Sequence, residues 1–143
     1  MSNRLLIYDA SEKSFLGLLW KIGAALAWFY FDKILPVKNW QDFQNKVEEL
    51  GNKYEEVQFW GHGSPGYIYI NNYSNKNTAW EILSRVLNKG AIVWLRVCSF
   101  ASQEMGKAAM ERVSSTLGAR LIANTHSIGQ STTSVLQDGA CKS

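Results

Sequence analysis

The most constraining feature of this sequence is the apolar run at residues 91–97, which only Arg96 interrupts. Such a run is expected at the centre of a parallel sheet, where helices cover both faces. Further short apolar runs at 4–8, 34–37, 57–60 and 120–123 are strand candidates, and segments with helical spacing separate them. Strands that alternate with helices predict an α/β fold with right-handed crossovers and a mostly parallel sheet.

The helices are expected at residues 14–32, 40–50, 78–88 and 102–117. The second of these has apolar residues at helical spacing and ends before Gly51. Between the third strand and the third helix, three glycines and one proline at 61–66 predict a tight loop. The alternating residues 67–70 then predict a small extra strand.

Composition limits the class of protein. A chain of 143 residues with 46% hydrophobic and 19% charged residues is typical of one globular domain, here taken as 1–143. The formal charge is +3, and the basic residues are scattered along the chain rather than gathered. We therefore expect no nucleic-acid partner.

Residues 15–31 are almost entirely apolar, with Lys21 as the only charge. We expect a helix that is buried in the domain or in a contact with a partner or a second copy of the chain. Membrane association is the less favoured alternative, because a lysine near the middle of a span costs about 2.5–3.5 kcal/mol. The first residues show no secretory signal pattern, which favours the cytoplasm.

The two cysteines, Cys98 and Cys141, have neither C-x-x-C nor metal-like spacing. Cys98 ends the apolar run, whereas Cys141 lies close to the C-terminus. We do not expect a structural disulfide between a strand end and a terminal tail, and we assign no role to Cys141.

His62, Cys98 and His126 each follow a predicted strand, so they are expected at the carboxyl edge of the sheet, where active sites collect. A thiol needs a nearby base, since its pKa of about 8.5 leaves it mostly protonated at neutral pH. His62 and Cys98 therefore form a candidate dyad, and the amides of Gly63 and Cys98 are candidate oxyanion donors. The alternative is a structural cysteine and a histidine in a glycine turn.

An apolar strand, His-Gly, a helix and a second apolar strand ending in Cys resemble the block pattern of the caspase-like clan of cysteine peptidases. Residues 60–70, WGHGSPGYIYI, are similar to the Ser-His-Gly-Ser-Pro-Gly signature of a bacterial caspase-like family of unknown function. The resemblance is strongest over 35–130. It implies a three-layer fold with main-strand order 2-1-3-4-5 and helices on both faces.

The resemblance also implies that the chain hydrolyses peptide bonds in a peptide or protein substrate without a cofactor. His62 would be the base, Cys98 the nucleophile and Gly63 an oxyanion donor, while Ser64 and His126 are candidates for substrate contact. Two departures from the family are Val97, where many members have a small residue, and Phe100, where glycine is frequent. A bulky Phe100 is expected to narrow the site.

There are three alternatives to the cysteine peptidase. A serine hydrolase is disfavoured because Ser64 lacks the Gly-x-Ser-x-Gly context of that class of enzyme. A metal site of His62, Cys98 and His126 has no closely spaced ligand pair, so no metal is expected. An inactive caspase-like module that binds a partner or a membrane through residues 15–31 is the principal alternative to the peptidase.

Overall fold

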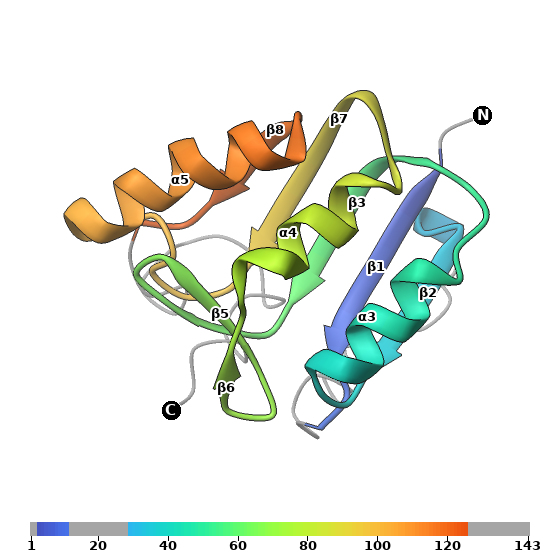
Figure 1. Ribbon diagram of the computed structural model, residues 1–143, viewed down its shortest axis with the longest axis horizontal. Helices are drawn as coiled ribbons and strands as arrows, with labels where there is room; N and C mark the ends of the chain where they lie inside the picture. Colours follow the sequence, from blue (N-terminus) through green and yellow to red (C-terminus); the bar gives the residue numbers. More distant parts are fainter. Residues whose placement is uncertain (1–2, 12–28, 126–143) are drawn as a thin grey trace.

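The computed structural model describes residues 3–11 and 29–125. Its central sheet has the spatial order β2-β1-β3-β7-β8, and every neighbouring pair is parallel (Figure 1). The predicted α/β class with a mostly parallel sheet is therefore confirmed. The strands are β1 (Arg4–Asp9), β2 (Lys33–Val37), β3 (Tyr54–Trp60), β7 (Leu87–Arg96) and β8 (Arg120–Ala123).

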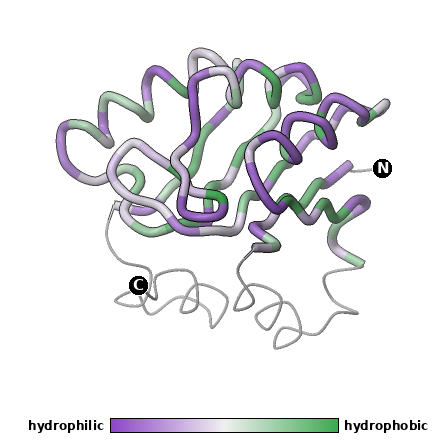
Figure 2. Tube along the Cα trace, turned by 60° about the horizontal axis from the view of Figure 1, so that its bottom comes forward, coloured by the Kyte–Doolittle hydropathy of each residue, from purple (hydrophilic) through white to green (hydrophobic). Residues whose placement is uncertain are grey.

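The described helices α3 (Trp40–Glu48), α4 (Asn77–Ser84) and α5 (Gln103–Leu117) lie along the same face of the sheet (Figures 1 and 2). They bury apolar side chains against the strands, including Phe43, Val47, Trp80, Leu83 and Val113. The helix expected at 14–32 falls outside the described residues except at its end. Helices on both faces consequently stay a prediction.

The boundary between α4 and β7 differs from the expectation. The predicted helix over 78–88 ends at Ser84 instead, and Leu87 already pairs with Tyr54 of β3. The Tyr54 amide donates a hydrogen bond of 2.7 Å to the carbonyl of Val86. Apolar spacing alone could not reveal this change, because Leu87 is buried in the core from the strand as it would be from a helix.

The segment predicted as a loop at 61–66 is instead the start of a small antiparallel sheet. Strand β4 (His62–Ser64) pairs with β5 (Tyr67–Ile70), and β5 pairs with β6 (Tyr73–Ser74). The turn between β5 and β6 is formed by Asn71 and Asn72, with φ angles of 53° and 67°. Asparagine tolerates this left-handed conformation better than most residues, and such turns suit tight hairpins.

Candidate active site

The sheet brings the two predicted catalytic residues to one edge. Trp60, the last residue of β3, lies opposite Arg96, the last residue of β7, in the parallel ladder. His62 and Cys98 each follow two residues later, and both are half-buried. Because neighbouring strands run about 4.8 Å apart, the segments that contain the two residues leave the sheet side by side.

Gly63 makes the contact between these segments unusually close. A Cβ atom added at Gly63 would lie 2.6 Å from Cγ2 of Val97 and 2.8 Å from the carbonyl oxygen of Cys98. Real Cβ atoms do not approach other atoms so closely, so any side chain here would force the backbones apart. The glycine therefore permits the His62–Gly63 backbone to pack directly on Val97 and Cys98.

The amide of Gly63 points away from the small sheet. Gly63 lies opposite Ile68 in the antiparallel pair. Ile68 uses its own backbone on the other side, donating to Oδ1 of Asn75 at 3.0 Å and accepting from the Asn75 amide at 2.9 Å. In an antiparallel ladder this alternation directs the N–H of Gly63 away from β5.

Cys98 carries a disulfide bond, contrary to the expectation of a free thiol. None of the cysteines among the described residues is free. The chain contains one other cysteine, Cys141, which lies outside those residues. The expectation rested on the absence of a C-x-x-C or metal-like spacing and on the position of Cys141 near the C-terminus, and neither feature excludes a disulfide at Cys98. A thiolate at Cys98 therefore requires prior reduction.

Phe100 does not narrow the site, contrary to the prediction. Its side chain is fully buried and makes an edge contact with Trp80, with 6.2 Å between ring centroids. Ser99 has a positive φ of 56°, in the left-handed region where the chain reverses its direction. The turn thus directs Phe100 into the core below the site.

Backbone hydrogen bonds hold this turn in place. The amide of Gly66 donates to the carbonyl of Phe100 at 2.9 Å, and the amide of Ala101 donates to the carbonyl of Asn124, also at 2.9 Å. The hydroxyl of Ser102 donates to the carbonyl of Ser99 at 2.7 Å. The segment after Cys98 is therefore fixed both to the β4–β5 hairpin and to the end of β8.

The two predicted substrate-contact residues have different outcomes. Ser64 lies at the end of β4 and its hydroxyl is 2.7 Å from the hydroxyl of Tyr69, so Tyr69 orients it. Ser64 is half-buried and remains a candidate. His126 lies outside the described residues.

Asp9 is a residue of this edge that sequence reasoning missed. It ends β1, is 2% exposed, and accepts hydrogen bonds from the amide and the hydroxyl of Ser11. Its second oxygen accepts from the amide of Asn71 at 3.3 Å, at the tip of the β5–β6 hairpin. Asp9 therefore connects the central sheet to the small sheet that carries His62. The sequence feature that could have identified Asp9 is an acidic residue directly after an apolar run.

Arg96 is the second residue of this edge that sequence reasoning missed. The feature that could have identified it is its position as the single charge in the central apolar run. The guanidinium lies over the rings of Trp94 and Trp60, 4.1 and 6.0 Å from their centroids. Its Nη1 donates to Oε1 of Gln58 at 3.4 Å, while its buried Nε has no hydrogen-bond partner. Burial lowers the pKa of Arg96. The guanidinium leans along β7 away from Cys98, so it supports the sheet rather than the thiol.

Among the described residues, no three side chains of His, Cys, Asp or Glu gather as a metal site would require. Within the same ranges, no helix is long and apolar enough to span a membrane. No protein-family model matches the chain, and no curated protein matches it. Any function proposed for this protein therefore rests on the geometry of the edge formed by His62, Gly63 and Cys98.

Proposed function

We propose that this protein is a caspase-like cysteine peptidase in which His62 and Cys98 hydrolyse peptide bonds. The observation that carries the proposal is the direct packing of Gly63 on the carbonyl of Cys98, which leaves no room for a side chain between the two segments. This packing holds the segment that carries His62 against the segment that carries Cys98, as a histidine–cysteine dyad requires.

The chemistry begins with the reduced enzyme. His62 takes the proton from the Cys98 thiol, and the thiolate sulfur attacks the carbonyl carbon of the substrate. The amides of Gly63 and Cys98 stabilise the negative charge on the carbonyl oxygen, and the protonated His62 gives its proton to the leaving amine. Water then attacks the thioester, releases the carboxylic acid and restores the thiol. None of these steps needs a cofactor.

The arrangement of the sheet supports the caspase-like comparison. Its order, β2-β1-β3-β7-β8, corresponds to 2-1-3-4-5 when the five parallel strands are counted along the chain. His62 and Cys98 follow the third and fourth of these strands, as the resemblance implies. The three-layer arrangement and membership of the clan are part of the proposal.

The second candidate function is an inactive caspase-like module, and the disulfide at Cys98 favours it. A structural disulfide suits an oxidising compartment, whereas a catalytic thiol suits the reducing cytoplasm that we propose for the peptidase. The module would bind a partner or a membrane through residues 15–31. At the end of this segment Phe29 is 91% exposed, as a contact residue would be.

The direct test is cleavage of a peptide library by the protein in a dithiol reductant, followed by mass spectrometry of the new termini. We expect a consistent set of cleavage sites that is absent with Cys98→Ala and with His62→Ala. Termini that persist with Cys98→Ala would come from a contaminant. If the parent protein yields none beyond those, the inactive module replaces the peptidase.

A further inference from the structure

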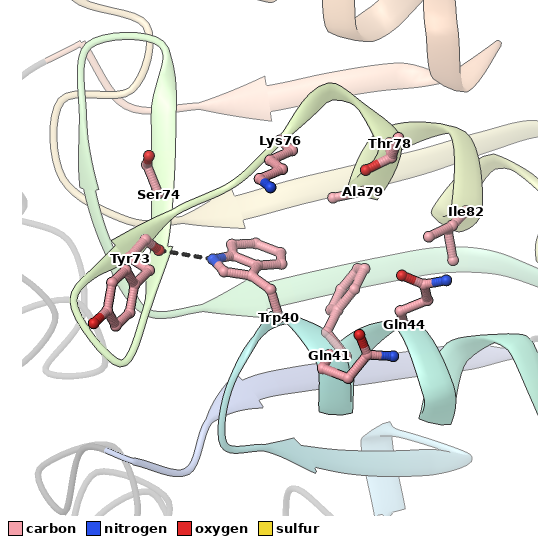
Figure 3. A pocket seen from close by; sticks show the side chains of 10 residues that line it. Trp40, Gln41, Gln44, Tyr73, Ser74, Lys76, Thr78, Ala79 and Ile82 are labelled. Carbon is pink, nitrogen blue, oxygen red and sulfur yellow. Dashed lines mark hydrogen bonds between the residues drawn. The ribbon is translucent and has the colours of Figure 1, made fainter.

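A groove of about 410 Å³ lies between the first turn of α3, strand β6 and the first turn of α4 (Figure 3). Neither His62 nor Cys98 lines it. Its volume is within the range of small-molecule sites, which is about 300–1,000 Å³. The groove is therefore large enough for a small ligand, and binding there would not depend on the chemistry of Cys98.

The α3 side of the groove is a fixed aromatic wall. The indole Nε1 of Trp40 donates a hydrogen bond of 2.7 Å to the carbonyl of Tyr73, shown as the dashed line in Figure 3. The Trp40 ring also makes an edge contact with the buried Phe43, with centroids 5.2 Å apart. Because both contacts exist without a ligand, the wall would lose little freedom on binding.

Four of the other side chains that line the groove are polar and uncommitted. The side chains of Gln44, Ser74, Lys76 and Thr78 make no hydrogen bond or ion pair with the described part of the chain. Lys76 is the only charged residue among those that line the groove in this part of the chain. In Figure 3, Lys76 and Thr78 border the groove from the α4 side and Gln44 from the α3 side.

We propose that this groove binds a small carboxylic acid that contains an amide and an apolar ring. The ring would pack against Trp40, the amide would exchange hydrogen bonds with Gln44, and the carboxylate would lie near Lys76 and the hydroxyl of Thr78. A primary amide offers both a donor and an acceptor, so one side chain can satisfy both polar atoms of the ligand amide. A cationic ligand is disfavoured because no carboxylate lines the groove.

The test uses N-acetyl-L-phenylalanine as the probe and N-acetyl-L-phenylalaninamide as its uncharged counterpart. The readout is the indole N–H resonance of Trp40 in the ¹⁵N-labelled full chain, assigned by its loss in Trp40→Phe. We expect a saturable shift with the acid and about threefold weaker binding of the amide. The factor is small because Lys76 is exposed, where an ion pair contributes little.

Lys76→Gln should remove the difference between acid and amide, and it leaves the aromatic wall intact. Lys89→Gln is the matched control, since Lys89 is also exposed but lies near the start of β7, at the opposite edge of the sheet. Absence of a saturable Trp40 shift with both probes would overturn the site. Equal affinities of the two probes for the parent protein would overturn recognition of the carboxylate.

Discussion

At the scale of single residues, Gly63 is the position on which the candidate site depends most. The close approach of the His62 and Cys98 segments exists because glycine has no side chain there. Glycine at position 51 is different: a Cβ added to it would meet nothing within 4 Å. Substitution of each glycine by alanine therefore distinguishes the steric effect at Gly63 from the general effect of replacing glycine.

We expect Gly63→Ala to lower the free energy of unfolding by about 1–3 kcal/mol, because the new methyl group overlaps Val97 and the Cys98 carbonyl. Gly51→Ala should be neutral or stabilising by a few tenths of a kcal/mol, since alanine restricts the unfolded chain. Urea unfolding of the three proteins measures both values. Equal stability of the two variants would show that Val97 and the Cys98 carbonyl leave room for a methyl group at position 63.

His62 and Cys98 could be predicted as neighbours because each directly follows a strand-like run, and parallel strands end at one edge. The burial of the Phe100 side chain in the core could not be predicted, since it depends on the positive φ at Ser99, a non-glycine residue. The disulfide was also beyond prediction. Spacing between cysteines gives no information about contacts made by folding.

At the scale of elements, α3 and α4 differ in whether a side chain accepts a hydrogen bond from a backbone amide of the first turn. The side chain of Asn39 accepts a hydrogen bond of 2.7 Å from the amide of Asp42 at the start of α3. Lys76 occupies the same position before α4 and makes no such bond. The start of α3 could be predicted from the sequence, whereas the cap of α4 was expected at Thr78, two residues after its actual position at Lys76. Lysine carries no capping signal.

Asn39→Ala should reduce the free energy of unfolding by about 1 kcal/mol, because the Asp42 amide loses its partner. Lys76→Ala is the control, as it changes the equivalent position of α4 without removing a capping bond. Thermal or urea unfolding measures the difference between the two variants. A loss in Lys76→Ala as large as that in Asn39→Ala would contradict the role of the cap.

At the scale of the whole molecule, the central sheet supplies stability and the small sheet carries half of the candidate site. Asp9 connects them by accepting a hydrogen bond from Asn71. The alternation of strands and helices predicted the central sheet. The small sheet was predicted only in β5, since β4 is short and contains glycine and β6 has two residues.

Burial raises the pKa of Tyr8 and of Tyr54 above the usual value of 10.0. Between pH 10 and the higher native pKa, the unfolded chain releases protons that the native protein keeps, so stability falls as pH rises. We expect the urea midpoint to decline above pH 10, and Tyr54→Phe to make that decline shallower. Tyr73→Phe, which changes a 70% exposed side chain, serves as the control. An identical decline in all three proteins would contradict this account.

The most direct test of the central claim is the rate of Cys98 alkylation by iodoacetamide as a function of pH. Cys141→Ser leaves Cys98 as the only cysteine of the chain. The dyad predicts a rate that reaches its plateau well below pH 8 and that loses this plateau when His62→Ala is added. Slow alkylation that rises only near the ordinary thiol pKa of about 8.5, with or without His62, would contradict the dyad.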